Sequence, residues 1–357
     1  MTPERRKRPT QREVAELAGV SQAAVSQVLN GRGGGVRIPE TTRQKVLQAM
    51  REVGYVPNVA ARRLAGGQNR ILGVFTYEPV FPSGSRDFFA PFLEGIEEAA
   101  ADLDYDLLLH TRPAAGGGAR PLYRDGTSRL RLADGTVMLG QVDGASRADL
   151  ARLLGEGHPV VFIGRREVPG FELPHVTADY AAATGHALGQ LLAHGHRRTL
   201  YLGAPLVHES AADRERGYRE AVEGTGTVGA VVRPDEVTPA LVAGHLAAGV
   251  TGVLFENEVL AAAWVGAAAS LGHRWPASYS FAVLGDPIAQ GELPPGWAHS
   301  RIPRPPMGRA AVRMLAALLA GETSRPITLP CEWVEGASMG PPPHSGPELP
   351  TKKENPR

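Results

Sequence analysis

The spacing of apolar residues near the start of the chain predicts a small bundle of short helices. In residues 10–30, apolar positions recur at helical spacing on either side of Gly19, and Ser21 can cap the second of two helices. Gly19 can take the left-handed conformation that a tight turn needs. A third apolar repeat predicts a helix from Pro39 to Val53. Two short helices joined by such a turn are typical of a helix-turn-helix, although an unrelated helical hairpin shares the pattern.

From Ile71 onward, short apolar runs alternate with longer helical stretches. Eight runs fit strands, among them ILGVFT, GTVMLG, RTLYLG and SFAVLG. The helical stretches between them include Phe89–Leu103, Tyr180–His194, Asp213–Glu223 and Val259–Leu271. This alternation predicts an α/β fold of parallel sheets covered by helices on both faces. So many strands favour two doubly wound sheets over one.

Two further segments stand apart from these patterns. The stretch PNVAARRLAGG, residues 57–67, has Pro at its first helical position and a Gly pair as a stop, which predicts one short helix. Leu64 is the only large apolar residue beside Arg62 and Arg63. Residues 339–357 are Pro-rich and polar, which predicts a disordered tail.

Charge is distributed unequally along the chain. Residues 1–70 hold 13 Lys and Arg against 5 Asp and Glu, a net charge of +8, while the remaining 25 against 32 leave −7. A basic head on an acidic body favours a polyanion partner for the head, and ordinary solvated surface charge is the alternative. The single cysteine, Cys331, excludes an internal disulfide framework. With neither a secretory signal nor a membrane span in the pattern, we expect a cytoplasmic protein.

Several of these segments together resemble the LacI/GalR family of bacterial transcription repressors. The resemblance rests on REVAELAGVSQAAVSQVLNG, TRQKVLQAMREVGYVPNVAARRLAGG, HGHRRTLYLG, RERGYREAV and PMGRAAVRMLAALLAGE. It implies an all-α helix-turn-helix DNA-binding domain in residues 1–56 and a hinge helix in residues 57–67. It also implies an effector-binding and dimerisation core in residues 71–338, built from two subdomains like those of periplasmic sugar-binding proteins. We expect the chain to cross between them near residues 164–174, 284–287 and 300–303.

The resemblance implies that a homodimer binds duplex DNA at a palindromic operator. The start of the second helix should read bases through Gln22, Ala23 and Gln27, and Gln27 replaces the Arg of most relatives, which suits adenine or weak reading. Leu64 should wedge into the minor groove, with packing against the core as the alternative. The remaining candidates are phosphate or capping contacts and hinge residues. The full DNA-binding set is Thr10, Arg12, Ser21, Gln22, Ala23, Ser26, Gln27, Asn30, Asn58, Ala61, Arg62 and Leu64.

The family's effector site implies a second group of residues, which should bind a small polar molecule, a sugar rather than a nucleobase. Arg214 and Asn257 match polar contacts of relatives, and the family's later aspartate falls on Gly285, with Asp286 next to it. Arg165 and Asp179 lie near the first expected crossing and could as easily belong to structural pairs. The effector-binding candidates are Asp87, Phe88, Phe89, Arg165, Arg214, Asn257 and Asp286. Whether the effector releases DNA or promotes binding stays open.

Three motifs that suggest enzymes fail in their context, so we expect no catalytic residue, metal or cofactor. GTGTVG at residues 224–229 joins a helix to a strand, the reverse of a dinucleotide fingerprint. GASMG around Ser338 precedes prolines instead of the helix of a nucleophile elbow. His194 and His196 have no further ligands at workable spacing. A carbohydrate-binding module without a DNA role remains the alternative function, and residues 112–133 have no interpretation.

Overall fold

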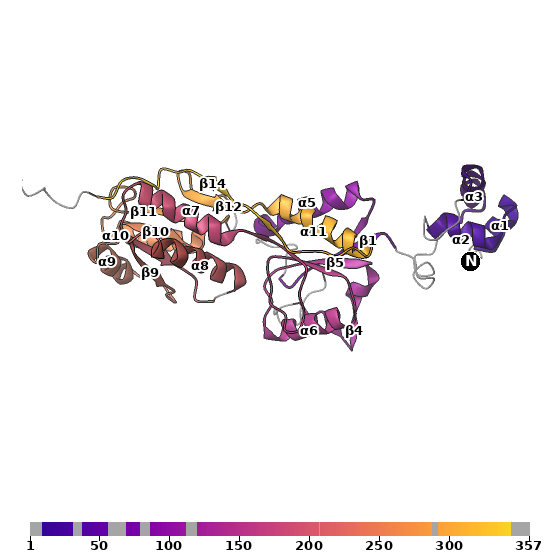
Figure 1. The fold of residues 1–357 in the computed structure, drawn as a ribbon, viewed down its shortest axis with the longest axis horizontal. Coiled ribbons are helices and arrows are strands. Elements are labelled where there is room, and N and C mark those ends of the chain that lie inside the picture. Colours follow the sequence, from indigo (N-terminus) through magenta and orange to yellow (C-terminus); the bar gives the residue numbers. More distant parts are fainter. Residues whose placement is uncertain are drawn as a thin grey trace, which may run out of the picture. The chain divides into compact units, whose positions relative to one another are not determined.

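The computed structural model describes residues 9–30, 38–55, 69–78, 86–111, 120–206, 208–287 and 292–343. Its contacts divide the chain into two units, Met1–Ile71 and Leu72–Arg357 (Figure 1). Some candidates lie outside the described residues, so their roles stay predictions. These are Asn58, Ala61, Arg62 and Leu64, together with the side chains of Asn30 and Asp87.

The first unit contains the three predicted helices, α1 (Gln11–Ala18), α2 (Gln22–Asn30) and α3 (Glu40–Val53). Their shared core is small, and Val14, Val25 and Val46 are fully buried in it, one from each helix. Because a core of this size stabilises little, the helix ends must contribute as well. The predicted arrangement of a helix-turn-helix followed by a third helix is confirmed.

Local capping explains why α1 and α2 begin and end where they do. The hydroxyl of Thr10 accepts a hydrogen bond from the backbone of Glu13, and the Thr10 backbone donates to the Glu13 carboxylate at 2.6 Å, which completes a capping box. Gly19 ends α1 in the left-handed conformation, with φ at 66°. Ser21 then caps α2 through a 3.2 Å hydrogen bond from the backbone of Ala24.

The first subdomain of the larger unit is a six-stranded sheet in the order β13-β7-β6-β5-β1-β2. Helices α5 (Arg86–Asp102) and α11 (Arg304–Leu319) pack side by side over one apolar face of this sheet, while α6 (Gly144–Gly155) packs on the other (Figure 1). The strands are β1 (Ile71–Thr76), β2 (Asp106–His110), β5 (Gly135–Leu139), β6 (Val160–Ile163), β7 (His175–Ala178) and β13 (Ile327–Leu329).

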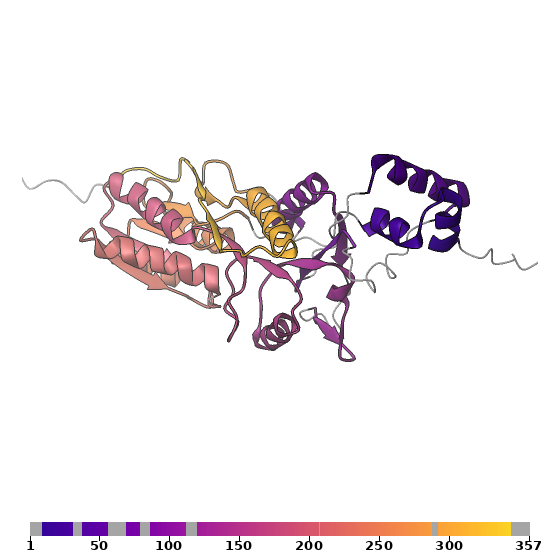
Figure 2. The same ribbon diagram turned by 45° about the vertical axis from the view of Figure 1, so that its right-hand side comes forward.

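The second subdomain repeats this plan with the strand order β14-β12-β11-β10-β8-β9. Helices α7 (Tyr180–Ala193) and α8 (Glu209–Glu223) cover one face of the sheet (Figure 2). Helices α9 (Pro239–Ala247) and α10 (Glu258–Ser270) cover the other. The strands are β8 (Arg198–Leu202), β9 (Val228–Val232), β10 (Gly252–Phe255), β11 (Ser280–Val283), β12 (Ala298–Arg301) and β14 (Glu332–Val334). Among the neighbouring strands of this sheet, β14 and β12 pair antiparallel, and all the other pairs are parallel. The predicted fold of two parallel-sheet subdomains is therefore confirmed.

Two of the three predicted crossings between subdomains are wrong. Residues 164–174 join β6 to β7 within the first sheet, and residues 284–287 follow β11, whose partner β12 belongs to the same sheet. The chain instead crosses between β7 and α7, between β12 and α11, and between β13 and β14. Only the crossing after β12 overlaps a predicted range, residues 300–303. A break in the apolar pattern marks a loop, but hydrogen bonding decides which sheet the next strand joins.

Strands β7, β12, β13 and β14 have no counterpart in the sequence prediction. Each has only three or four residues, too few for a clear alternation of apolar and polar positions. Helix α8 also begins one turn before the predicted Asp213, because His208 caps it. Short elements and caps of this kind depend on partners that are distant in the sequence.

The predicted boundary of the tail at residue 339 is too early. Gly340 donates a hydrogen bond to the Ser280 hydroxyl and accepts one from it, each at 3.0 Å, so the ordered chain continues beyond β14. The described part of residues 112–133 also has a structure. It forms a hairpin of β3 (Tyr123–Arg124) and β4 (Thr127–Ser128) followed by a 3-10 turn, and Leu122 and Leu130 pack into the core beneath α6.

Candidate functional site

The exposed face of α2 carries the residues predicted to read bases. Gln22, Ala23 and Gln27 are exposed, whereas Val25 on the opposite side of the helix is fully buried. Ser26 is half-buried. The small core contacts α2 on the side of Val25 only. The amide groups of Gln22 and Gln27 and the methyl group of Ala23 therefore remain accessible to solvent. Amide groups of this kind form paired hydrogen bonds with the edge of adenine.

The candidate phosphate contacts of the first unit have local roles in the free protein. Thr10 and Ser21 cap helices, and Arg12 forms an ion pair with Glu16 at 3.1 Å, one turn further along α1. Both side chains of that pair are largely exposed, and exposed pairs contribute little to stability. The Arg12 guanidinium can therefore exchange Glu16 for a phosphate at low cost.

A cavity of about 380 Å³ lies between the two subdomains of the larger unit. Its lining includes five predicted effector residues, namely Phe88, Phe89, Arg214, Asn257 and Asp286. Arg165 is not among the lining residues, but its neighbour Arg166 is. The cavity also has polar lining residues that the sequence did not predict, mainly Glu78, Gln141, Tyr180, His208 and Glu256.

Aromatic side chains form one wall of this cavity. Phe88 lies edge to face with Phe89, with ring centroids 5.2 Å apart, and with Phe92 at 5.8 Å. Phe89 is 6% exposed and belongs to the core of the first subdomain, so most of its surface serves packing. Phe88 is only partly buried, which leaves an apolar face for a ligand.

Arg214 on α8 is held rigidly at the opposite wall. Its Nε donates to the carbonyl oxygen of Leu284 at 2.7 Å, and its guanidinium lies 4.3 Å from the ring centroid of Tyr180. Gly285 occupies the position on which the family's aspartate falls and lies beside this guanidinium. A Cβ atom there would lie 3.3 Å from Nη2 of Arg214.

Asp286 and Asn257, two other predicted residues, line the cavity and also form structural contacts. Asp286 accepts a 2.7 Å hydrogen bond from the backbone of Ile302 and lies 3.3 Å from Arg304, so its carboxylate is already paired. The side-chain oxygen of Asn257 caps α10 by accepting from the backbone of Leu260 at 3.1 Å. The amide NH₂ group of Asn257 remains as a donor for a ligand.

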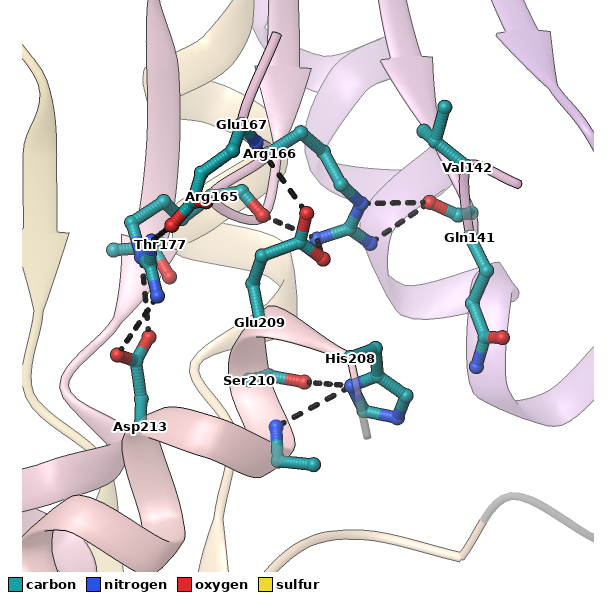
Figure 3. A network of polar contacts seen from close by, with 12 residues as sticks. Gln141, Val142, Arg165, Arg166, Glu167, Thr177, His208, Glu209, Ser210 and Asp213 are labelled. Carbon is teal, nitrogen blue, oxygen red and sulfur yellow. Dashed lines mark hydrogen bonds and ion pairs between the residues drawn. The ribbon is translucent and has the colours of Figure 1, made fainter. Parts of the chain in front are cut away.

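His208 contributes a hydrogen-bond donor that the sequence did not reveal. Its Nδ1 accepts from the backbone of Ala211 at 3.3 Å and lies 2.9 Å from the Ser210 hydroxyl (Figure 3). Burial and then the nearby charge of Arg214 lower the pKa of His208 below its ordinary value, so the ring is neutral near pH 7. With Nδ1 accepting, the proton of the neutral ring resides on Nε2.

A network of ion pairs joins the subdomains beside the cavity. Glu209 at the start of α8 accepts from the backbone of Glu167 at 3.3 Å and lies 3.9 Å from Arg166 (Figure 3). Its carboxylate also lies 3.3 Å from Arg147 of α6. Burial alone would raise the pKa of Glu209, but backbone N–H groups and Arg166 outweigh burial and lower it.

Arg165 belongs to the same network and has no partner in Asp179. It forms ion pairs with Asp213 at 3.1 Å and with Glu167 at 2.6 Å, while Asp179 caps α7 through the backbone of Ala182. The structural role that was an alternative for Arg165 is therefore the one that the structure shows. Asp179 likewise has a structural contact, with a different element from that of Arg165.

Metal and membrane sites have no counterpart in the described residues. No group of three or more His, Cys, Asp or Glu side chains in these segments could hold a metal ion. His196 is fully buried, with one ring nitrogen 2.9 Å from the Thr251 hydroxyl and the other 2.9 Å from the Gly340 carbonyl oxygen, so it links segments of the second subdomain. None of the described helices combines the length and the apolar character that crossing a membrane requires.

Comparison with known proteins gives matches to both units. Residues 10–58 match the model of bacterial regulatory proteins of the lacI family. Residues 79–238 match periplasmic binding proteins and the sugar-binding domain of the LacI family, and residues 188–339 match a periplasmic binding protein-like domain. These matched ranges cover the helix-turn-helix and both subdomains.

Individual relatives extend over most of the chain. The HTH-type transcriptional regulator GntR of Pseudomonas aeruginosa is 30% identical over 329 residues, which cover 89% of this chain and 91% of the relative. A solved complex of the transcriptional regulator CelR with cellobiose is 25% identical, with a TM-score of 0.56, and covers 93% and 100% of the two chains. The lac repressor dimer bound to operator and the anti-inducer ONPF has the same fold, with a TM-score of 0.65 at 21% identity and coverage of 94% and 100%. The chain therefore belongs to the LacI family of DNA-binding transcriptional regulators.

Proposed function

We propose that the protein is a homodimeric repressor that binds a palindromic operator and whose DNA affinity is controlled by a sugar. One observation carries this proposal: a single chain combines an exposed reading face on α2 with a cavity lined by both subdomains of the larger unit. LacI-family regulators are not enzymes, and the cavity is accordingly interpreted as a binding site.

The DNA-binding part of the proposal assigns residues 1–56 to the DNA-binding domain and residues 57–67 to a hinge helix. One α2 helix reads only a few base pairs, so two copies related by a two-fold axis would double the contacts and require a palindromic site. The solved lac repressor, which shares this fold, is a dimer bound to operator. In this proposal, Gln22, Ala23 and Gln27 read bases and Leu64 acts as the minor-groove wedge.

The effector part of the proposal rests on the shape and chemistry of the cavity. Its volume of about 380 Å³ falls within the range typical of small-molecule sites. Phe88 supplies an apolar face for a sugar ring, and Arg214, Asn257 and His208 supply donors for hydroxyl groups. The related CelR was solved in complex with cellobiose. A ligand held by both subdomains stabilises one relative arrangement of them, which is how effector binding can alter DNA affinity.

The test of DNA binding uses the full-length protein and a pool of random duplex DNA. Repeated selection should enrich a palindrome with two half-sites, and sedimentation of the complex should give two protein chains per site. Affinity for that site should fall steeply with salt, with a slope near −0.9 for each phosphate neutralised, because bound counterions are released. Absence of any enriched sequence would contradict the proposal.

The alternative is a carbohydrate-binding module without a DNA role. It predicts that sugars raise the melting temperature while no DNA sequence is selected. The net charge of +8 in residues 1–70 argues against it, because a sugar-binding module has no use for a compact cationic head.

A further inference from the structure

Arg214 is a buried cation that no described carboxylate neutralises. The residue is 7% exposed, and its hydrogen bonds go to the carbonyl oxygens of Leu284 and Ser210. Its guanidinium also lies over the ring of Tyr180. Buried charges in proteins are normally paired, because removing an ion from water without a partner costs free energy. This guanidinium also lines the cavity, where a ligand can reach it.

Two carboxylates of the cavity wall are already paired with other arginines. Glu256 lies 2.9 Å from Arg233 and accepts a 2.8 Å hydrogen bond from the Tyr201 hydroxyl. Asp286 is paired with Arg304 at 3.3 Å. The negative charges of Glu256 and Asp286 are therefore offset by Arg233 and Arg304, and neither carboxylate neutralises Arg214.

The opposite subdomain contributes a second arginine whose charge is only partly balanced. Arg166 donates to the carbonyl oxygen of Gly140 at 2.8 Å, and its nearest described carboxylate is that of Glu209, 3.9 Å away. Glu209 lies closer to Arg147, at 3.3 Å, so one carboxylate serves two guanidinium groups. Glu78, the remaining acidic residue of the wall, accepts a 3.0 Å hydrogen bond from the backbone of Gln141.

The charges of the cavity therefore leave an excess of one positive charge. Once the pairs of Glu256 with Arg233 and of Asp286 with Arg304 are set aside, two lining guanidinium groups, those of Arg166 and Arg214, face one lining carboxylate, that of Glu78. Outside the lining, Glu209 and Arg147 cancel each other in this count. Both arginines line the cavity, Arg166 from the loop after β6 of the first subdomain and Arg214 from α8 of the second. The two cationic groups thus reach the cavity from different subdomains.

We propose that the effector is a sugar acid, a sugar with one carboxylate, and that this carboxylate binds between Arg166 and Arg214. The inference rests on the proposed effector site and narrows the class of its ligand. A guanidinium presents a planar pair of N–H donors that matches the two oxygens of a carboxylate. The uncharged remainder of the sugar would lie against Phe88, with Asn257 and His208 donating to its hydroxyl groups.

The test compares matched neutral and acidic sugars on the full-length protein. The pairs are cellobiose with cellobionate and glucose with glucuronate, measured by thermal shift and by titration calorimetry at one ionic strength. The acidic member of at least one pair should raise the melting temperature and bind about tenfold or more tightly than its neutral partner, because a hydrogen bond to a charged group is stronger than one to a neutral group.

Variants locate the effect within the cavity. Arg166→Gln and Arg214→Gln should each reduce the preference for the acid by about tenfold or more. Arg216→Gln is the matched control, because Arg216 is on the same helix as Arg214 but more than half exposed. Arg216→Gln should leave the preference unchanged.

The possible outcomes separate this inference from the proposed function. A neutral sugar that binds as tightly as its acid, or a preference for the acid that survives in Arg214→Gln and Arg166→Gln, would overturn the sugar-acid inference and leave the effector site standing. If no sugar of either kind binds, the inference and the effector part of the proposed function both fall. Selection of an operator sequence tests the DNA-binding part independently of these measurements.

Discussion

The carboxylate of Glu209 lies 3.3 Å from the guanidinium of Arg147, and this contact joins α8 of the second subdomain to α6 of the first. The side chain of Glu209 is 13% exposed, which removes much of the solvent screening that weakens surface pairs. The network around Glu209 therefore holds the two walls of the cavity together on one side.

Glu209→Gln should destabilise the larger unit by about 1–3 kcal/mol, because Arg147 and Arg166 would lose a charged acceptor. It should also change the pH dependence of stability. The folded protein lowers the pKa of Glu209 below its ordinary value of 4.5, so the contribution is present above pH 4.5 and is lost as pH falls through the lower folded value. Urea unfolding measured from pH 3.5 to 7 should show a smaller acid loss in the variant.

The control for this measurement is Glu98→Gln, which removes the carboxylate of a more exposed ion pair with Arg309. Its effect should be within about 1 kcal/mol at every pH. Equal effects of the two substitutions would show that the network around Glu209 is an ordinary surface contact.

Gln27→Arg should change the sequence preference of the protein at one position of each half-site from adenine to guanine. The longer side chain can form paired hydrogen bonds with the guanine edge, and a good pair of this kind discriminates by about 1–3 kcal/mol. Binding to operators that differ at single positions would measure the shift. Gln48→Arg adds the same charge to an exposed position on α3, so it should strengthen binding without changing the preferred base.

Leu64→Ala should weaken operator binding and reduce DNA bending while leaving thermal stability almost unchanged. A wedge acts only in the complex, because bending depends on unstacking the central base step. A core leucine cut to alanine would instead cost about 2–5 kcal/mol of stability. Circular-permutation gel shifts and melting curves together distinguish the two roles. Normal bending by a variant that melts far below the parent would show that Leu64 packs in a core.

Gly217→Ala should destabilise the second subdomain and weaken effector binding. A Cβ atom at Gly217 would collide with the backbone of Ala181, so α8 would have to move away from α7, and it would carry Arg214 with it. Overpacking of this kind costs about 1–3 kcal/mol. Chemical unfolding and effector titration would measure the two effects.

Gly189→Ala is the matched control for this close approach of α7 and α8. Gly189 lies within α7, where a Cβ would meet nothing within 4 Å. Alanine there should stabilise the helix by up to about 1 kcal/mol, because alanine loses less backbone entropy than glycine. If Gly217→Ala and Gly189→Ala both stabilise the protein, then α7 and α8 can separate at Gly217 without loss of stability.

Elements that depend on nearby residues were predictable from the sequence. The left-handed Gly19 and the cap at Ser21 both involve partners within a few positions, and the structure contains each of them. The eight apolar runs likewise form strands, because alternation and length are local properties. The resemblance to a known family then placed Phe88, Arg214 and Asn257 at the cavity.

Only the tertiary structure decided how distant segments combine. Arg165 and Arg166 are adjacent and chemically identical, yet the loop after β6 directs Arg165 to Asp213 and Arg166 to the cavity. Asp286 lines the cavity as predicted, but its carboxylate is paired with Arg304, the first residue of α11. A sequence records which residue types are present and how far apart they lie along the chain. The direction of a side chain and its partner depend on which strands pair and where the chain crosses, and these are set by contacts between residues far apart in the sequence.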